Sequence, residues 1–174
     1  NLVWKDGVIK INKYWDYKIK SNHDISFIDA KNIYTDLLTD SVKIRMRSDV
    51  PVGTTLSSGV DSASIVSILR KFYKNEHKTF SAVFNSDRYD KSEKSLYSSN
   101  IKINEEDLIV KLTKELDLKS FIINIKDTNF IERLKRNIYH LESGNSSPAT
   151  IPLDEILQNA QGQVKVVLEG QGAD

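Results

Sequence analysis

The chain has no cysteine in its 174 residues, which excludes disulfide bonds, cysteine-based zinc sites and a thiol nucleophile. No apolar run approaches membrane-spanning length, and the start at Asn1 does not resemble a signal peptide. The formal net charge is only +1, so nothing favours long-range attraction to nucleic acid or to an anionic membrane. We therefore expect no nucleic-acid or membrane partner, and the lack of cysteine fits a reducing, cytoplasmic location.

The composition is that of a soluble globular domain. Hydrophobic residues make up 39% of the chain and charged residues 28%. A length of 174 residues fits one domain with a real core. Two basic runs, 43–47 and 133–136, lie inside helical patterns, and we interpret both as solvated helix faces.

Apolar periodicity predicts alternating strands and helices. The predicted strands are 8–11, 52–56, 79–84, 121–125 and 164–168, and the predicted helices are 26–48, 61–74, 104–117, 127–141 and 150–161. Ser26 and Asp29 form a capping pair for the first helix, and Gly162 ends the last one. The helix at 61–74 carries an apolar face of Ile65, Ile68, Leu69 and Phe72. Residues 85–103 show no period, and we interpret them as a long loop or insertion.

The order of these elements predicts an α/β fold, a three-layer sandwich with a mostly parallel sheet and helices on both faces. Ligands of such sheets bind outside the carboxyl ends of the strands, where the strand order switches. Residues 1–25 are short and turn-rich. An ordinary surface turn is one interpretation of this segment, and the main α/β domain would begin at residue 26.

The segment from Val50 to Ser62 is the most informative part of the sequence. An apolar run ends in small residues, and then Asp61 and Ser62 open a helical pattern. Such a turn directs backbone N–H groups and the positive end of a helix toward an anion. A carboxylate at Asp61 is useful beside a phosphate only when a cation bridges them, which indicates Mg²⁺. The Lys-Ser/Thr pair of a Walker A loop is missing, and a plain strand-to-helix connection with Asp61 as the cap is the alternative.

The run Ser57-Ser58-Gly59-Val60-Asp61-Ser62 resembles the Ser-Gly-Gly-x-Asp-Ser pyrophosphate loop, or PP-loop, of the ATP pyrophosphatases, which have the adenine-nucleotide α-hydrolase fold. The preceding Val50-Pro51-Val52-Gly53 narrows the resemblance to the asparagine synthetase family, and the run from Val166 to Asp174 is similar to the second signature of that family. The resemblance covers roughly residues 45–174. The resemblance implies that residues 1–25 are a linker or short β segment from a preceding domain. It also implies that residues 26–174 are the N-terminal part of an ATP-binding synthetase domain, truncated at the C-terminus, in a fragment that lacks the glutaminase domain.

The resemblance implies an ATP-dependent ligase that activates a carboxylate, aspartate or a related acid, as an acyl-adenylate and forms an amide. Its cofactors would be ATP and Mg²⁺, its nitrogen would come from ammonia or from glutamine through the glutaminase domain, and a homodimer is compatible with it. The residues implied to bind ATP or pyrophosphate are Leu56, Ser57, Ser58, Gly59, Asp61, Ser62, Ala82, Val83, Glu169 and Gly170. The implied metal ligands are Asp61 and Asp174, and the implied catalytic residues are Asp61, Asp174 and Gln171. Strand core is the alternative for Leu56, Ala82 and Val83, and Gly170 would let the backbone approach the nucleotide.

Three positions depart from the family pattern. Ser58 replaces a glycine of the loop, Glu169 stands where a serine is common, and Gln171 stands where many asparagine synthetases have glutamate. An amide cannot act as a base, so asparagine is not assured as the product. A second hypothesis is therefore a non-catalytic or degenerate nucleotide-binding module in a surface-polysaccharide or related biosynthetic system. A third, an RNA sulfur transferase with a similar loop, is disfavoured by the missing cysteines. We expect the isolated fragment to be inactive.

Overall fold

In the computed structural model, the described residues are 1–18, 24–73, 77–84, 105–125, 130–144, 147 and 149–171. The insertion predicted at 85–103 lies outside them, as do Gly172, Ala173 and Asp174. The chain divides into two compact units, Asn1–Leu37 and Leu38–Asp174. The boundary expected at residue 25 stays a prediction. Among the described helices, none is long and apolar enough to cross a membrane.

The N-terminal unit contains an antiparallel hairpin of β1 (Leu2–Lys5) and β2 (Val8–Ile11). Asp6 and Gly7 join the strands with φ angles of 50° and 78°, the left-handed geometry that a tight hairpin needs. The strand expected at 8–11 is therefore confirmed, whereas its partner strand was not expected from the sequence.

Helix α1 (Phe27–Arg45) begins as the capping pair predicts. The Asp29 N–H donates to Oγ of Ser26 at 3.1 Å, and the Ser26 hydroxyl donates to the Asp29 carboxylate at 2.6 Å. The cap satisfies one of the amide groups that the first turn of a helix leaves unpaired. The helix ends three residues earlier than the predicted 48, before the extended chain that leads to Pro51.

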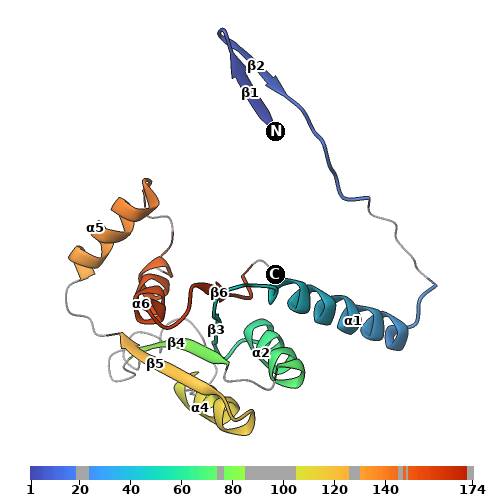
Figure 1. The fold of residues 1–174 in the computed structure, drawn as a ribbon, viewed down its shortest axis with the longest axis vertical. Coiled ribbons are helices and arrows are strands. Elements are labelled where there is room, and N and C mark those ends of the chain that lie inside the picture. The colour runs from blue at the N-terminus through green and yellow to red at the C-terminus, as the bar shows by residue number, and fades with distance from the viewer. Residues whose placement is uncertain are drawn as a thin grey trace, which may run out of the picture. The chain divides into compact units, whose positions relative to one another are not determined.

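The second unit is built on a four-stranded parallel sheet with the strand order β5-β4-β3-β6 (Figure 1). The strands are β3 (Val52–Thr55), β4 (Lys78–Phe84), β5 (Lys119–Ile125) and β6 (Val166–Leu168). The helices are α2 (Val60–Phe72), α4 (Glu105–Glu115), α5 (Phe130–Leu141) and α6 (Thr150–Ala160). The parallel sheet expected from the sequence is confirmed, and the element boundaries differ by only a few residues.

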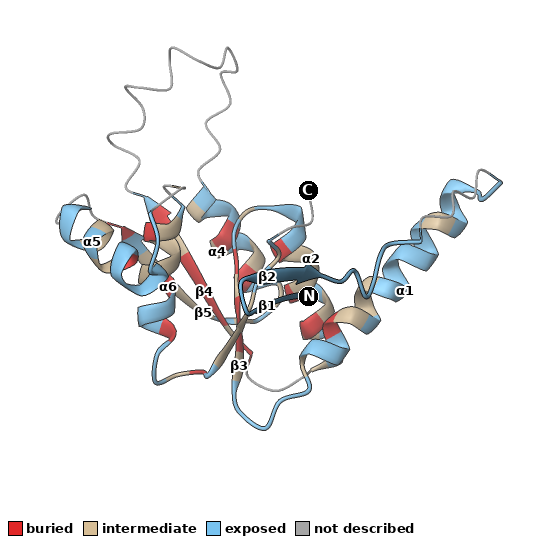
Figure 2. Cartoon of the chain, turned by 90° about the horizontal axis from the view of Figure 1, so that it is seen from above, coloured by how far each residue is buried: buried red, intermediate tan, exposed pale blue. Residues whose placement is uncertain are grey.

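Helices cover both faces of this sheet, which confirms the expected three-layer architecture. Buried residues of α2 and α4 pack around Val83 of β4 on one face. On the other face, Ile156 and Ala160 of α6 pack against Phe80 of the same strand. Val83 and Phe80 point in opposite directions because successive residues of a strand alternate between faces. Figure 2 shows buried residues on β4 and on the helices that meet the sheet.

Gly53 lies in the middle of β3, where packing leaves no space for a side chain. A Cβ at this position would lie 2.8 Å from Cε2 of Phe80 and 3.2 Å from Cγ1 of Val164. Glycine therefore allows β3 to lie between β4 and β6 while Phe80 fills the core beside it. This packing gives a structural reason for the glycine in the Val50–Gly53 motif.

The interpretation of 133–136 as a solvated helix face is wrong for Arg133, whose side chain is only 19% exposed, and incomplete for Arg136, which is 36% exposed but also pairs with α6. Nε of Arg133 lies 3.0 Å from Oε1 of Glu155, and Nε of Arg136 donates to Oδ2 of Asp154 at 2.8 Å. The hydrogen bond with Asp154 also raises the pKa of the Arg136 guanidinium. These charge-assisted bonds join α5 to α6, because both acidic residues belong to α6.

The buried face of α2 also differs from the expected one. Its buried residues are Ser62, Val66 and Leu69, whereas Phe72 is 42% exposed. The helix is rotated so that Ser62, rather than an apolar residue, enters the interior at its first turn. The polar contacts of Ser62, described below, explain this orientation.

His77 is buried beside the sheet's central strands, at 6% exposure, and its Nε2 is hydrogen-bonded to Oγ1 of Thr54 in β3. Burial lowers the pKa of the imidazole because the charged form loses its hydration. In the unfolded chain, His77 begins to bind a proton near pH 6.5, the usual value for histidine. In the folded chain, His77 is still neutral at that pH. The unfolded state binds more protons there, so stability falls as the pH drops below that value.

We expect a His77→Gln variant to lose about 1–3 kcal/mol at pH 7.5, where the Thr54 bond and the packing are fully formed. On lowering the pH from 7.5 to 5.5, the wild-type chain should lose more stability than this variant. Urea unfolding at both pH values measures the difference. A matched variant of the exposed His140, His140→Gln, should follow the wild type; equal pH dependence in all three chains would contradict the assignment.

Candidate functional site

The candidate site lies at the carboxyl ends of β3 and β6. From β3 the chain passes through α2 to β4 on one side, whereas β6 pairs with β3 on the other side. The crevice between β3 and β6 is therefore the switch point of the sheet. The register that pairs Thr54 with Leu168 places both following loops at the same edge. A cavity of about 470 Å³ opens there, within the size range of small-molecule sites.

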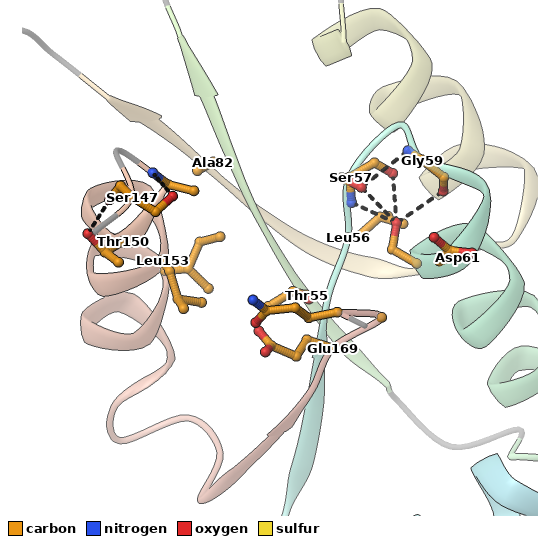
Figure 3. Close-up of a pocket in the computed structure, with 15 residues that line it drawn as sticks. Thr55, Leu56, Ser57, Gly59, Asp61, Ala82, Ser147, Thr150, Leu153 and Glu169 are labelled. Carbon is orange, nitrogen blue, oxygen red and sulfur yellow. Dashed lines mark hydrogen bonds between the residues drawn. The ribbon is translucent and has the colours of Figure 1, made fainter. Parts of the chain in front are cut away.

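The loop after β3 is held by the hydroxyl of Ser62, which is 7% exposed. Oγ of Ser62 accepts from the Ser57 N–H at 3.1 Å, and the two serine hydroxyls lie 2.9 Å apart. The carbonyl oxygens of Ser57 and Gly59 each lie 3.2 Å from the same hydroxyl (Figure 3). In addition, the Gly59 N–H donates to Oγ of Ser57 at 3.2 Å. The loop thus uses the amides of Ser57 and Gly59 to fix its own shape.

The alternative interpretation required Asp61 to be the cap of α2, and the structure shows that it is not. The N-cap is Gly59, without a side-chain cap, and the helix begins at Val60. Asp61 is exposed in the first turn and lines the cavity. No described residue donates a hydrogen bond to its carboxylate or forms an ion pair with it. The first turn of α2, whose N–H groups lack intrahelical partners, and the Asp61 carboxylate therefore border the same cavity (Figure 3).

The second loop lies against the first. A Cβ on Gly170 would lie 3.1 Å from Cβ of Asp61 and 3.2 Å from the Ser62 nitrogen. Glycine is thus needed for the close approach of the two loops, a structural role beside the nucleotide contact expected for it. On either side of Gly170, Glu169 and Gln171 are exposed and line the cavity.

The structure brings most of the sequence-predicted site residues to this cavity. Those that line it are Leu56, Ser57, Gly59, Asp61, Ser62, Ala82, Glu169, Gly170 and Gln171. Among the described lining residues, neither Ser58 nor Val83 appears, and Val83 packs instead in the core with Leu56. Asp174 lies outside the described residues, so its pairing with Asp61 stays a prediction. The remaining assignments to ATP, metal and catalysis also stay predictions.

Sequence reasoning missed one whole wall of the cavity. This wall comes mainly from α6 and the residues before it: Ser147, Ala149, Thr150, Leu153 and Ile156, with Thr55 at the end of β3. Thr150, Leu153 and Ile156 recur every three residues on one helix face, a pattern that ordinary core packing also produces. Only the tertiary structure shows that this face lines the cavity. The ion pairs of α5 fix its position through Asp154 and Glu155.

The charge of the cavity restricts what can bind. Asp61 and Glu169 are the charged residues among its described lining, which contains no lysine or arginine. Among the described residues, no group of three or more histidine, aspartate or glutamate side chains is placed to hold a metal. An anionic ligand would therefore need to bring cations with it to offset two carboxylates.

We expect Ser62→Ala to destabilise the chain by about 1–3 kcal/mol, because a buried hydroxyl that joins the loop to the helix is lost. Ser67→Ala is the matched control, since Ser67 lies in the same helix but is exposed and donates only to the Ala63 carbonyl. The control should change stability by less than about 0.5 kcal/mol. Denaturant unfolding of both variants measures the difference, and equal losses would contradict the role of Ser62 as the residue that holds the loop.

Comparison with known proteins agrees with the two sequence motifs. The chain matches the asparagine synthase family over residues 34–174. It is 32% identical over 139 residues to asparagine synthetase [glutamine-hydrolyzing] 1 of Bacillus subtilis (strain 168), a match that covers 80% of this chain and 20% of that protein. Asparagine synthetase [glutamine-hydrolyzing] 3 of the same organism is 32% identical over 102 residues, 59% of this chain and 16% of its own length. The chain thus spans about a fifth of the length of these relatives.

A solved structure, the NH3-dependent NAD synthetase from Campylobacter jejuni in complex with the nitrate ion, aligns with a TM-score of 0.49 and 14% identity, over 80% of this chain and 56% of that one. The family match covers both loops that meet at the cavity, and the motifs that predicted them are the motifs of that family. The chain therefore belongs to the asparagine synthase family.

Proposed function

We propose that this chain forms the ATP-binding part of an amide-forming ligase that activates a carboxylate as an acyl-adenylate with release of pyrophosphate. The observation that carries the proposal is the convergence of two loops, after β3 and after β6, on one cavity at the switch point of a parallel sheet. The similarity to glutamine-hydrolysing asparagine synthetases supports the ligase class.

The loop after β3 is suited to hold the pyrophosphate portion of ATP. The first turn of α2 borders the cavity, and the helix dipole adds positive potential there. Ser57, Ser58 and Gly59 shape this loop, while Ser62 contributes its hydroxyl to the fold of the loop rather than to a ligand. Leu56 and Ala82, with the apolar residues of α6, provide a surface for the adenine ring.

Asp61 fits the role of a Mg²⁺ ligand. Its carboxylate is exposed in the cavity and has no described partner, and carboxylate oxygens are the ligands that Mg²⁺ prefers. Bound Mg²⁺ would offset the negative charge of the leaving pyrophosphate. Asp174 is proposed as the second carboxylate by its place in the second signature.

The proposed reaction proceeds in two displacements. A carboxylate oxygen of the acid attacks the α-phosphorus of ATP, the bond to the β-phosphate oxygen breaks, and pyrophosphate leaves. The nitrogen of ammonia then attacks the acyl carbon, AMP leaves, and a proton is lost as the amide forms. In the longer protein, a glutaminase domain would supply the ammonia. The name of the Bacillus subtilis relative describes it as glutamine-hydrolyzing, which supports this nitrogen source.

A nucleotide-binding module without catalysis is the second candidate, and Gln171 favours it. The Gln171 side chain lines the cavity but cannot accept a proton as a carboxylate does. In this case the site would bind Mg·ATP without cleaving it, and no acid, whether aspartate or a related compound, would be activated.

Exchange of labelled pyrophosphate into ATP tests the proposal. With Mg²⁺ and a panel of carboxylic acids, the intact protein should exchange label with at least one acid, because adenylation is reversible. EDTA should abolish both exchange and nucleotide binding, since the cavity has two carboxylates and no described cation. Release of ADP and orthophosphate would refute acyl-adenylation, and Mg·ATP binding without exchange for any acid would favour the binding module.

Replacing Asp61 with Asn should lower the exchange rate at least about 100-fold, near 3 kcal/mol of transition-state stabilisation, because the variant loses the charge that holds Mg²⁺. Its unfolding free energy should change by less than about 1 kcal/mol, the usual size of a first-turn carboxylate effect. Asp107→Asn is the control, since Asp107 is a first-turn carboxylate of α4 outside the cavity lining. An unchanged exchange rate in the Asp61 variant would contradict its role as a Mg²⁺ ligand. Asp61 would then serve only to stabilise the N-terminal end of α2 with its negative charge.

A further inference from the structure

Glu169 is a carboxylate on a firmly held backbone. The carbonyl of the preceding Leu168 accepts from Oγ1 of Thr55 at 3.5 Å, and Leu168 pairs with Thr54 in the sheet. The following Gly170 packs directly on Asp61 in the first turn of α2. The Glu169 side chain itself is exposed, lines the cavity, and has no hydrogen bond or ion pair with any described residue. A carboxylate that stands on a held backbone and lacks a partner among the described residues is available to a ligand.

The cavity has two chemically different ends, and Glu169 lies between them. Ser57, Gly59 and Asp61 form a polar end next to the first turn of α2, whereas Ala82 and Leu153 form a more apolar end near α6. In Figure 3, Thr55 and Glu169 lie between these two groups. A nucleoside triphosphate placed with its phosphates at the polar end and its base at the apolar end would bring its sugar to the middle, beside Glu169.

An ionised carboxylate accepts hydrogen bonds and donates none, so a ligand group beside it must be a donor. The sugar of a ribonucleotide offers two such donors, the 2′ and 3′ hydroxyls. Carboxylates at the ends of parallel strands bind ribose hydroxyls in other nucleotide sites as well. A carboxylate so close to a triphosphate is otherwise unfavourable, because like charges repel. These hydrogen bonds would offset that repulsion.

We propose that Glu169 accepts hydrogen bonds from the sugar hydroxyls of the bound nucleotide and thereby selects ATP over deoxy-ATP. The inference rests on the proposed function, because it requires that the cavity bind ATP. It gives a role to a residue that departs from the family pattern.

The absolute affinity for ATP is a poor measure of that role, since removing a negative charge also weakens repulsion of the phosphates. The ratio of affinities for ATP and its deoxy analogues cancels this effect.

The test is calorimetric titration of the chain with ATP, 2′-deoxy-ATP and 3′-deoxy-ATP, each with excess Mg²⁺. The wild-type chain should bind ATP at least about tenfold more tightly than one or both analogues, the value of a hydrogen bond to a charged acceptor. In Glu169→Ala, that preference should fall below about twofold, and in Glu169→Gln it should fall partway. Glu115→Gln, an exposed position on α4 outside the cavity lining, should keep the wild-type preference.

The outcomes separate the two claims. An equal preference in the wild type and Glu169→Ala, or no preference in the wild type, overturns the inference while ATP binding still supports the proposed function. No binding of any nucleotide by the wild type contradicts the proposed function and the inference with it. Thermal unfolding checks that each variant is folded. If Glu169→Ala does not fold, Glu169→Gln decides, and an unchanged preference for ATP over the deoxy analogues in that variant overturns the inference.

Discussion

The parallel pairing of β6 with β3 is the contact on which the candidate site depends. Residues 52 and 166 are far apart in sequence, yet the register pairs Val52 with Val166 and Thr54 with Leu168. Because both strands end at the same edge, the loop after each one reaches the same cavity. Gly53 and Gly170 make this arrangement possible at two points: one lets β3 fit beside Phe80, and the other lets the two loops touch. A Cβ at Gly53 would overlap the Phe80 ring, and a Cβ at Gly170 would require the two loops to shift apart by a few tenths of an ångström.

The electrostatics of the cavity follow from this geometry. The loop uses the hydroxyl of Ser62 and two of its own amides to hold its shape, so the positive potential comes mainly from the first turn of α2. The carboxylates of Asp61, in that first turn, and of Glu169 line the same cavity. A site with helix-end donors and carboxylates, and without a described lysine, suits an anion that carries its own metal ion. This distinguishes it from a Walker A loop, in which a lysine supplies that charge.

Much of the fold could be predicted because each element carries a local signal. Apolar periodicity located the strands and helices, and the Ser26–Asp29 pair located the start of α1. The two signature motifs predicted that Asp61 and Glu169 serve one site, and both residues line the same cavity. What could not be predicted depends on contacts between distant residues. Three features arise from tertiary packing, which local sequence patterns do not reveal. They are the α6 wall of the cavity, the pairing of the α5 arginines with α6, and the buried face of α2 that includes Ser62.

The second loop shows how a fold constrains one residue and leaves its neighbour open to change. Gly170 is confined by backbone and Cβ atoms of Asp61 and Ser62, which belong to the first turn of a helix and cannot move independently. Glu169, one residue earlier, extends into the cavity, where only a ligand would limit its side chain. Substitutions at Gly170 are therefore opposed by folding itself, whereas substitutions at Glu169 are opposed only by function. Position 169 can therefore change without disturbing the contact between β3 and β6 that builds the site.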